Sequence, residues 1–449
     1  MEKIKNNLLN IFKSNKALAI IIAISFLASL SYSFYFQIQP KVDANAYDNI
    51  GWNLVQGNGY RESLEGPIEL DYAITRIGPL YQFTLAGIYS IFGHHYEPVW
   101  VLQAMLHALT VWLVYLISIL IFKENKNKKT ISLIAATVIG FYPDLIEIST
   151  MLLIETFYLF LFCLALYIFF KYFDGHNIYS AVLVGVFFAL ATMARPPVLC
   201  LIPIVIFYFY QKKKYVLGII FIAAILMVFT PWTVRNYNIY HKIAPLGVGG
   251  AFNFWIGNYH GANGEQEPSP KSWEYIKEYG IIEIQPKAIY EFKSFLFEHP
   301  VEFVNLTFLR INKYFSVARP MGWWFYQDGL GQLIILTSSA FASIVLFVFG
   351  LGGIIKAWVS NNLKLKYLLV FTIITPLIIF ITVIETRYRL QIYPLLAIFT
   401  GYFAVDLAKN QKPWLNKILW ISVAIISLNG LIDVFLSFDR IKERIQRFL

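Results

Sequence analysis

A single carboxylate follows the first hydrophobic run of the chain and is suited to acid–base chemistry. Asp43 opens the stretch Asp43-Ala44-Asn45-Ala46-Tyr47, a few residues beyond the end of that run. A carboxylate at a membrane boundary is costly in free energy unless it is paired, hydrated or used in a reaction. When such a group lies within hydrogen-bond reach of an attacking hydroxyl, it can accept the hydroxyl proton. Asp43 is therefore the first candidate for catalysis. The alternative from the residues alone is that Asp43 caps a helix beginning at Ala44.

The arginines are the second group of residues suited to chemistry. Those that lie close to expected helix ends are Arg76, Arg195, Arg235, Arg387 and Arg389. A guanidinium stays charged and can bind two oxygens of a phosphate at once, whereas a lysine is a compact, strongly hydrated charge. The group therefore predicts a phosphate site. An alternative that stays open is that these side chains extend to the lipid headgroups.

Other ionisable residues have less specific surroundings. Asp48 lies on a different face of the expected short helix from Asp43, which favours a solvated or structural carboxylate. Glu155 lies in an apolar helix, where an acid either contacts substrate or pairs with an arginine such as Arg195. The neighbouring histidines at 94 and 95, with Glu97, do not predict a metal site, because adjacent side chains point in different directions.

The elements that must position these residues are membrane helices. Of the 449 residues, 58% are hydrophobic, 18% aromatic and only 14% charged, as in proteins that cross the membrane several times. A helix needs roughly 20 apolar residues to cross the hydrocarbon layer. About eleven such runs are centred near residues 27, 110, 136, 159, 186, 204, 223, 342, 375, 398 and 426. Continuous runs rather than alternating ones predict an all-α bundle.

The net charge of +10 comes from lysines grouped between the expected spans, which argues against nucleic acid as a partner. These lysines are Lys3, Lys5, Lys13, Lys16, Lys123, Lys126, Lys128, Lys129, Lys212, Lys213, Lys214, Lys364, Lys366, Lys409, Lys412 and Lys417. A cytoplasmic N-terminus places all of them in the cytoplasm, as the positive-inside rule requires. Both large loops, 37–97 and 233–330, are then extracytoplasmic excursions from a single membrane domain over residues 1–449.

Both loops are expected to contain helices that lie in the membrane interface. In the first loop, residues 44–56 form a short helix, and residues 79–92 form another that starts at Pro79 and stops at Gly93. In the second loop, residues 286–318 form interfacial helices broken near His299-Pro300. Before that loop, Pro231-Trp232 predicts the end of a span, so that Arg235 opens the loop.

Short motifs occur in a fixed order along most of the chain. They are Asp43-Ala44-Asn45-Ala46-Tyr47, Asn53-Leu54, Gly57-Asn58-Gly59-Tyr60, Thr75-Arg76-Ile77-Gly78-Pro79-Leu80-Tyr81, Leu153-Ile154-Glu155-Thr156, Ala194-Arg195-Pro196, Thr230-Pro231-Trp232-Thr233-Val234-Arg235-Asn236, Phe254-Trp255-Ile256-Gly257-Asn258 and Glu385-Thr386-Arg387-Tyr388-Arg389. The ordered set resembles the membrane glycosyltransferases of family 39 and their relatives, the protein mannosyltransferase and aminoarabinose transferase group of the GT-C superfamily.

The resemblance implies an enzyme that takes a sugar from a polyprenyl phosphate or diphosphate in the outer leaflet. The acceptor would be a glycan, a lipid or a protein, and transfer would usually invert the anomeric carbon. By the same resemblance Asp43 is the base and Arg76 binds the lipid phosphate, with Arg235 and Arg387 or Arg389 as further candidates. The candidates for either substrate contact or a structural role are Tyr47, Asp48, Glu155, Arg195, Asn258 and Tyr388.

Ala44 departs from the pattern of this family, in which a second carboxylate often follows the first. Without that acid the sequence predicts no metal site, and the dependence on a divalent metal is left open. Two other functions also remain: a flippase or transporter of a lipid-linked oligosaccharide, and a glycan polymerase or ligase. The composition, rich in Lys, Ile and Asn, suits a bacterium or archaeon and hence the plasma (inner) membrane.

Overall fold

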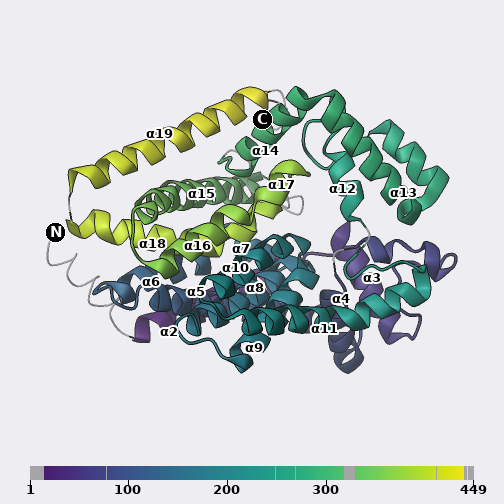
Figure 1. The fold of residues 1–449 in the computed structure, drawn as a ribbon, viewed down its shortest axis with the longest axis horizontal. Helices are drawn as coiled ribbons and strands as arrows, with labels where there is room; N and C mark the ends of the chain where they lie inside the picture. Colours follow the sequence, from purple (N-terminus) through teal and green to yellow (C-terminus); the bar gives the residue numbers. More distant parts are fainter. Residues whose placement is uncertain are drawn as a thin grey trace.

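The computed structural model describes residues 15–76, 78–247, 249–267, 269–317, 329–410, 412–438 and 442. Over these ranges the chain forms helices and loops, with one isolated parallel bridge between Glu265 and Ile384. Figure 1 shows long helices lying side by side, with α3, α4, α12 and α13 gathered at one end of the molecule. The prediction of an all-helical membrane bundle is confirmed. The lysines at positions 3, 5 and 13 lie outside the described residues.

The helices fall into three groups by their place in the fold: the bundle, short helices that extend it, and helices of the two large loops. The bundle contains α2 (Asn15–Phe36), α5 (Glu97–Ile121), α6 (Lys128–Gly140), α8 (Ile154–Lys171), α9 (Ile178–Ala194), α10 (Ile202–Gln211), α11 (Tyr215–Tyr240), α15 (Gly329–Trp358), α16 (Leu363–Ile374), α18 (Tyr393–Asn410) and α19 (Pro413–Leu436). Short helices extend some of these: α7 (Pro143–Ile148), α17 (Leu377–Ile381) and the 3-10 helices η3 (Pro196–Leu201) and η5 (Thr386–Ile392). The two large loops contain η1 (Ile68–Leu70), η2 (Tyr72–Thr75), α3 (Asp43–Val55), α4 (Leu80–Phe92), α12 (Gly250–Ile256), α13 (Pro270–Glu298) and α14 (Pro300–Tyr314).

Eight helical segments of the described chain are long and apolar enough to cross a membrane. They are Lys16–Phe36, Glu97–Ile121, Ile154–Lys171, Tyr215–Tyr240, Gly329–Trp358, Leu363–Ile381, Thr386–Lys409 and Pro413–Leu436. Shorter apolar helices are Ile178–Ala194 and Pro196–Gln211. These two meet at Arg195, between the predicted runs centred near residues 186 and 204. The count of about eleven spans stays a prediction.

The helices predicted within the loops are present in the structure. Helix α3 covers residues 44–55 of the predicted 44–56 segment, and α4 ends at Phe92, directly before Gly93, whose φ of 78° suits glycine. The predicted break at His299-Pro300 separates α13 from α14. Helix α13 begins at Pro270, before the predicted start, because it consists of two helices joined at Gly280, whose φ of 73° and ψ of 163° are not helical. Ser269 caps the first of these by accepting a hydrogen bond from the backbone amide of Ser272.

The predicted end of a span at Pro231-Trp232 is wrong. Helix α11 runs through Pro231 and ends at Tyr240, so Arg235 lies inside the helix. Proline removes one backbone donor from the helix, and threonine hydroxyls on both sides of it donate to carbonyls four residues earlier. The hydroxyl of Thr230 donates to the Leu226 carbonyl at 2.7 Å, and that of Thr233 donates to the Phe229 carbonyl at 2.9 Å.

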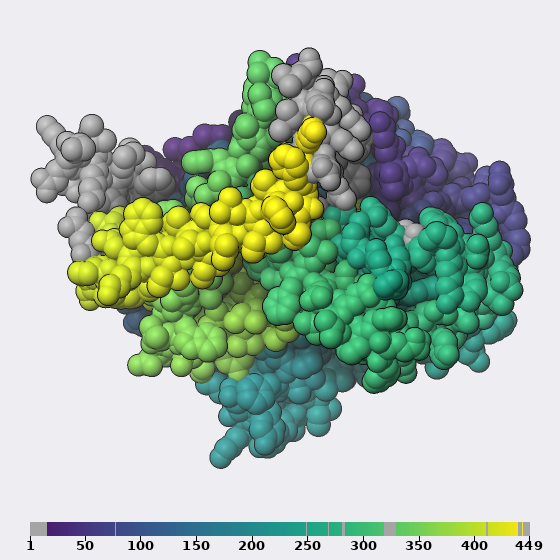
Figure 2. Space-filling view, turned by 90° about the horizontal axis from the view of Figure 1, so that it is seen from above, coloured from purple at the N-terminus to yellow at the C-terminus, as the bar shows by residue number. Residues whose placement is uncertain are grey.

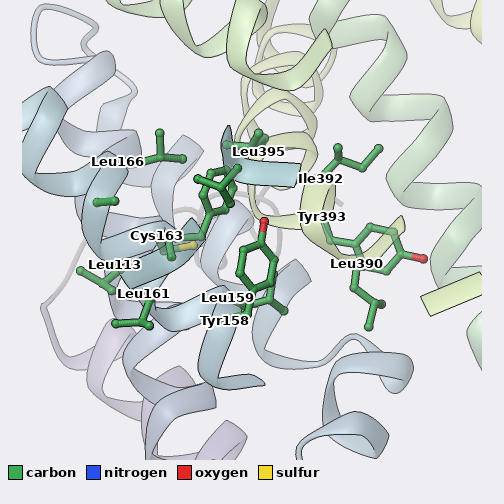
Figure 3. Close-up of a cluster of buried hydrophobic side chains, with 14 of the residues drawn as sticks. Leu113, Tyr158, Leu159, Leu161, Cys163, Leu166, Leu390, Ile392, Tyr393 and Leu395 are labelled. Atoms are coloured by element: carbon green, nitrogen blue, oxygen red, sulfur yellow. The ribbon is translucent and has the colours of Figure 1, made fainter. Parts of the chain in front are cut away.

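The centre of the bundle is a continuous cluster of buried apolar side chains. Figure 3 shows part of it, where Leu159 and Cys163 of α8 pack near Leu113 of α5 and Tyr393 of α18. Helix α8 is the most central of the long, uninterrupted spanning helices, with 72% of its most apolar stretch buried. Packing of this helix fixes the position of Glu155, which is its second residue.

Two glycines allow the later helices to approach closely. A Cβ atom at Gly353 would lie 2.2 Å from the Phe399 carbonyl oxygen, and one at Gly401 would lie 2.3 Å from the Ile131 carbonyl oxygen. Helices α15, α18 and α6 therefore pack backbone against backbone, as small residues permit between membrane helices. Helix α19 instead lies on the outside of the bundle, in yellow in Figure 2, and only 22% of its most apolar stretch is buried. Its remaining apolar surface is suited to lipid.

Candidate functional site

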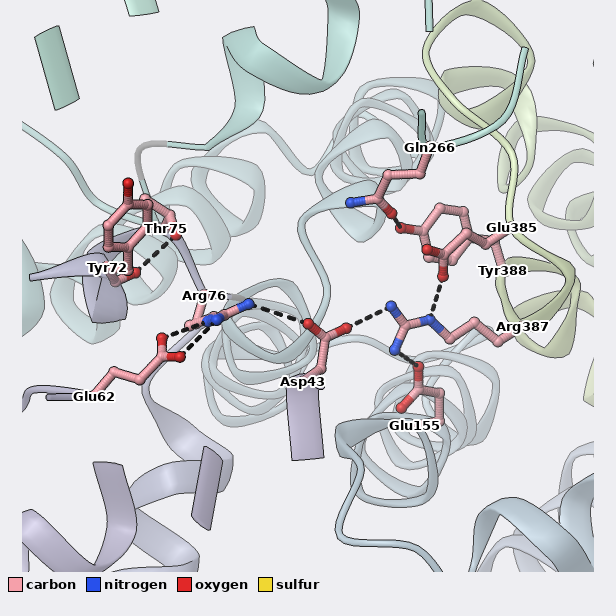
Figure 4. A network of polar contacts seen from close by, with 10 residues as sticks. All are labelled: Asp43, Glu62, Tyr72, Thr75, Arg76, Glu155, Gln266, Glu385, Arg387 and Tyr388. Carbon is pink, nitrogen blue, oxygen red and sulfur yellow. Dashed lines mark hydrogen bonds and ion pairs between the residues drawn. The ribbon is translucent and has the colours of Figure 1, made fainter. Parts of the chain in front are cut away.

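Asp43 lies at the centre of a network of charged side chains (Figure 4). It is the first residue of α3, and its two carboxylate oxygens accept hydrogen bonds from different arginines. Arg76 donates to Oδ1 at 3.2 Å, and Arg387 donates to Oδ2 at 2.6 Å. The N-cap position belongs to Val42, so the alternative in which Asp43 caps a helix starting at Ala44 is wrong. The partly positive start of α3 adds to the attraction for this carboxylate.

Arg76 reaches Asp43 because an acidic loop holds it from the other side. The Nη2 and Nε atoms of Arg76 donate to the two carboxylate oxygens of Glu62, at 2.7 and 2.8 Å, which makes a bidentate pair. Glu62 is in turn positioned by Asp71, whose carboxylate accepts from the backbone amides of Glu62 and Ser63 at 2.7 and 2.9 Å. The loop between α3 and α4 is therefore folded around carboxylates that orient one arginine.

Arg387 connects Asp43 to the core of the bundle. It lies in η5, where its Nε donates to Glu385 at 2.6 Å and its Nη1 lies 3.6 Å from Glu155. Glu155 also forms an ion pair with Arg195, which sits between α9 and η3. The expected pairing of Glu155 with Arg195 is present. The helical backbone is interrupted before η3 and before η5, which places these arginines at helix ends. Irregular backbone of this kind occurs at membrane depth where protein rather than lipid surrounds it.

The cations keep Asp43 ionised. Burial is the largest single effect on this carboxyl and favours its protonated form, but the charge of Arg387 and its hydrogen bond, followed by the charges of Arg76 and Arg195, outweigh it. The pKa of Asp43 is consequently lowered. Burial has a corresponding effect on Tyr47, one turn along α3, where it raises the pKa of the phenol. Of these two side chains of α3, Asp43 is therefore the charged one, and Tyr47 stays neutral.

Aromatic and amide groups complete the edge of the network. The guanidinium of Arg195 lies 5.2 Å from the ring centre of Tyr388, and that of Arg387 lies 5.8 Å from it. The Tyr388 hydroxyl donates to Gln266 at 3.2 Å, which links η5 to the loop after α12 (Figure 4). Tyr47 is buried and packs edge-to-face on Tyr81 of α4, with ring centres 5.9 Å apart.

A small cavity lies beside this network. It is lined by Glu155, Tyr158, Leu159, Arg195, Arg387, Tyr388, Leu390 and Gln391. Its volume of about 10 Å³ is roughly the space that one water molecule needs. Among the described residues, Glu155 Oε2, the Tyr158 hydroxyl and Gln391 Oε1 have no hydrogen-bond partner. The cavity is therefore polar enough to hold a water molecule or a single hydroxyl group.

Comparisons with known proteins agree with this architecture. Residues 77–234 match the sequence profile of a family described as dolichyl-phosphate-mannose-protein mannosyltransferase. An oligosaccharyltransferase from Archaeoglobus fulgidus, solved with zinc and sulfate, is 15% identical over 92% of this chain, with a TM-score of 0.52. ArnT from Cupriavidus metallidurans, solved with undecaprenyl phosphate, is 12% identical over 93% of this chain, with a TM-score of 0.50. The chain has the GT-C fold.

A third GT-C structure, the oligosaccharyltransferase AglB from Archaeoglobus fulgidus with an inhibitory peptide and a dolichol-phosphate, is 14% identical over 95% of this chain, with a TM-score of 0.50. The present chain covers only 51%, 65% and 55% of the lengths of these three structures, respectively. No curated protein sequence matches it. The resemblance inferred from the ordered motifs is confirmed, and the matched segment contains Glu155 and Arg195 but neither Asp43 nor Arg387.

Other predicted residues lie outside the network. Asp48 is buried, and its carboxylate accepts from the hydroxyls of Tyr89 and Tyr96 at 2.6 and 2.8 Å and lies 2.9 Å from His94. This arrangement joins α3 to the end of α4 and the start of α5. It also gives His94 a polar partner, while its ring stacks on Trp52 with ring centres 4.7 Å apart.

Two predicted phosphate ligands have other surroundings. Arg389 is fully buried and donates to the Ser316 carbonyl at 2.6 Å and to Asp144 at 3.5 Å, which places it in the core of the bundle. Arg235 lies against the rings of Trp232, Tyr60 and Tyr240, 4.9 to 5.4 Å from their centres. The structure therefore brings Arg76, Arg195 and Arg387 to Asp43, but neither of these two.

Asn258 connects the second large loop to the end of α17 through hydrogen bonds. Its side-chain amide donates to the carbonyls of Phe254 and Ile381 at 2.8 and 3.1 Å, and its oxygen accepts from Arg310 at 2.8 Å. Arg310 also donates to the carbonyl oxygens of Gly257 and Phe380, so the buried guanidinium holds the loop after α12 against α14 and α17. Sequence reasoning did not single out Arg310, because nothing in the pattern around it distinguishes a buried arginine from an interfacial one.

Glu62 and Glu385 are the site residues that sequence reasoning missed. Both are loop carboxylates that orient an arginine next to Asp43. Glu385 could have been found, because it lies two residues before Arg387 in a quoted motif. Glu62 offers no such signal, since its contact with Arg76 depends on how the whole loop folds around Asp71.

Proposed function

We propose that this protein is an integral membrane glycosyltransferase that transfers a sugar from a polyprenyl-phosphate-linked donor to a glycan, lipid or protein acceptor. The observation that carries the proposal is the position of Asp43 between Arg76 and Arg387, at the end of the bundle where the loop helices lie, in a chain with the GT-C fold. The transferred group would be a hexosyl or pentosyl unit. The reaction would take place on the extracytoplasmic face of the plasma membrane, where the two large loops meet.

Structures with the same fold support the choice of donor. AglB was solved with a dolichol-phosphate and ArnT with undecaprenyl phosphate, and both ligands are lipid phosphates. A lipid phosphate places its anionic group at the membrane boundary and its chain in the hydrocarbon layer. Helix-end arginines beside an apolar bundle suit both parts of such a molecule.

The proposed chemistry is a single displacement. The acceptor hydroxyl oxygen attacks the anomeric carbon, the bond from that carbon to the donor phosphate oxygen breaks, and the lipid phosphate leaves with the bonding electrons. Asp43 takes the hydroxyl proton, and the guanidiniums of Arg76 and Arg387 stabilise the charge that grows on the phosphate. One displacement inverts the anomeric carbon. We give the positive charge to these guanidiniums and assign no metal to this step.

The arrangement also suggests how donor binding activates the base. In the structure both carboxylate oxygens of Asp43 are occupied by arginines, which lowers its pKa and makes it a weak base. A donor phosphate that draws these guanidiniums toward itself frees the carboxylate, and its own negative charge raises the pKa of Asp43 further. Asp43 would then become a stronger base only when the donor is in place.

Substitution of Asp43 tests the proposal in purified protein. In detergent, Asp43→Asn should abolish transfer from a polyprenyl-phosphate-linked sugar while donor binding persists. Asp174→Asn is the matched control, because Asp174 is an exposed carboxylate paired with Lys364, far along the chain. Full activity of Asp43→Asn would rule out the base assignment. Sugar transfer in detergent also separates the proposal from a flippase, which would move labelled lipid in liposomes without transfer, and product length separates it from a glycan polymerase or ligase.

A further inference from the structure

Three potential metal ligands converge in the second large loop, and their side chains have no part in the network around Asp43. His260 follows α12, His299 lies between α13 and α14, and Glu302 is in the first turn of α14. The ligand atoms of these three side chains all lie within 4.8 Å of one another. Segments about forty residues apart in sequence therefore bring two imidazoles and a carboxylate to one place.

The carboxylate is already oriented for a ligand. Glu302 Oε1 accepts a hydrogen bond from the backbone amide of Gly261 at 2.9 Å, and Oε2 lies 3.0 Å from His260 Nδ1. One oxygen is thus fixed by the backbone while the other faces the histidine. Such hydrogen bonds to a ligating carboxylate are typical of the surroundings of protein metal ions.

The second histidine is placed by the junction between the two helices. His299 is the single residue between α13 and α14, and Pro300 starts α14 directly after it, so the chain turns at a fixed point. Its ring centre lies 5.7 Å from that of Phe295 and 5.5 Å from that of His260, with an angle of 30° between the two imidazole planes. His299 immediately precedes α14 and Glu302 lies in its first turn, so the two residues are three positions apart.

We propose that His260, His299 and Glu302 bind a zinc ion. Two imidazole nitrogens and one carboxylate oxygen are ligands that zinc prefers, with a water molecule in the fourth position of a tetrahedron. Bond lengths of about 2.0–2.1 Å require ligand atoms roughly 3.3 Å apart, which the present cluster reaches by a small side-chain movement. His260 has that freedom, since 82% of its side chain is exposed.

Zinc at this position would link the loop after α12 to α14. That loop approaches the Asp43 network through neighbouring contacts: Ile384 donates its backbone amide to the Gly264 carbonyl at 3.0 Å, and Gln266 accepts from Tyr388 at 3.2 Å. Lys313 of α14 pairs with Glu265 at 2.7 Å from the other side. The ion would therefore hold in place the loop that borders η5, and its effect on the protein would be structural.

Zinc binding can be measured without knowing the substrates. The full chain, purified in detergent with a tag that contains no histidine and stripped of metal with a chelator, is titrated with zinc chloride by calorimetry. We expect one zinc ion per chain. His299→Ala and Glu302→Gln should each weaken binding by about 100-fold or more, because each removes one of three protein ligands. Glu302→Gln retains an oxygen that can accept from Gly261, which guards against a folding defect.

Matched controls decide whether the binding belongs to this cluster. His95→Ala removes an exposed histidine outside the cluster and should leave the zinc affinity unchanged. Limited proteolysis gives a second readout, since zinc should slow cleavage in residues 258–267 of the unsubstituted chain but not in His299→Ala. The proposal is wrong if the chain binds no zinc, or if His299→Ala and Glu302→Gln both bind zinc with the same affinity as the unsubstituted chain. Neither outcome depends on glycosyl transfer.

Discussion

At the scale of single residues, the central fact is that both carboxylate oxygens of Asp43 already accept hydrogen bonds from arginines. Arg76 and Arg387 each occupy one side of the carboxylate, and each arginine is itself held by a further acid, Glu62 or Glu385. A base in this state is charged but weak, because its partners favour the ionised form. Activity then requires that the substrate change these contacts.

The pH dependence of the two kinetic constants should reveal this change. The constant kcat/KM reports the free enzyme, in which the pKa of Asp43 is lowered, so kcat/KM should fall only at pH values below the ordinary range of an aspartate. The constant kcat reports the donor complex, so its acidic limb should lie at higher pH. Measured pH–rate profiles with acidic limbs at the same pH would contradict the transfer of arginines from Asp43 to the phosphate.

Substitution of the arginine at 76 extends this test. In Arg76→Ala, Asp43 loses one of the cations that lower its pKa, so the acidic limb of kcat/KM should move to higher pH. The apparent affinity for the donor should also fall. Unchanged affinity for the donor would remove Arg76 from the phosphate site, whatever the pH profile shows.

Arg387 should matter for stability as well as activity. It is almost fully buried among Asp43, Glu155 and Glu385, so Arg387→Met leaves these acids without their shared cation. Loss of one partner from a buried ion pair typically costs about 3–5 kcal/mol of unfolding free energy. Lys364→Met breaks the pair with exposed Asp174 and should cost roughly 1 kcal/mol or less. Unfolding in detergent, followed for both variants, compares the two effects.

The sequence located much of this site but not its internal contacts. Asp43, Arg76 and Arg387 were predicted from residue type and position near helix ends, and they meet in the structure. Arg389, two residues from Arg387, was predicted for the same role and instead lies in the core beside Asp144. The two positions carry the same residue type in the same short motif. They differ only in the direction that the turn of η5 gives to each side chain. Local patterns do not contain that information.

At the scale of elements, Gly78 controls how the loop bearing Arg76 approaches the bundle. A Cβ atom at Gly78 would lie 1.3 Å from the carbonyl oxygen of Met193, in the last turn of α9. Its φ of 29° is also unfavourable for other residues. The loop therefore depends on a glycine at the point where it meets the helix that precedes Arg195.

Gly78→Ala should consequently displace Arg76 and Glu62 relative to Asp43. We expect transfer to fall by about 100-fold, in line with the effect of a misplacement of about 1 Å at an active site. Gly87→Ala is the control, because Gly87 is in α4 and nothing lies within 4 Å of a Cβ atom added there. Equal activity of the two variants would show that the close contact with Met193 does not set the geometry of the site.

Helix existence was more predictable than helix ends. Apolar runs and the pair Pro79 and Gly93 identified α4 almost to the residue. The end of α11 was misjudged at Pro231, because the helix continues through that proline. The start of α13 was misjudged, because a separate helical segment capped by Ser269 precedes Gly280. In neither case does the hydropathy pattern record where the helical backbone begins or ends.

At the scale of the whole molecule, the structure gathers helices from both large loops at one end of the bundle (Figure 1). The charge pattern predicts that this end is extracytoplasmic and that the lysine-rich loops lie on the other side. Helices α12 to α14 and the loop between α3 and α4 would then form the entrance for the donor and acceptor.

Cysteine labelling in intact cells tests this orientation. In a chain with Cys163 and Cys200 replaced by alanine, Glu65→Cys should react with a membrane-impermeant thiol reagent from outside. Lys126→Cys should react only after the membrane is permeabilised. Both positions are in loops, so access to the reagent depends on the side of the membrane. The reverse pattern of labelling would invert the predicted topology and move the proposed site to the cytoplasm.

The ion pair between Asp43 and Arg387 joins residues 344 positions apart in the chain. During synthesis the first span and its carboxylate are made and can enter the membrane long before η5 leaves the ribosome. Until then, of the two arginines that donate hydrogen bonds to Asp43, only Arg76 has been made. The complete charge network, and with it a competent base, can form only when nearly the last span has been inserted. An incompletely synthesised chain would thus be inert toward lipid-linked sugars already present in the membrane.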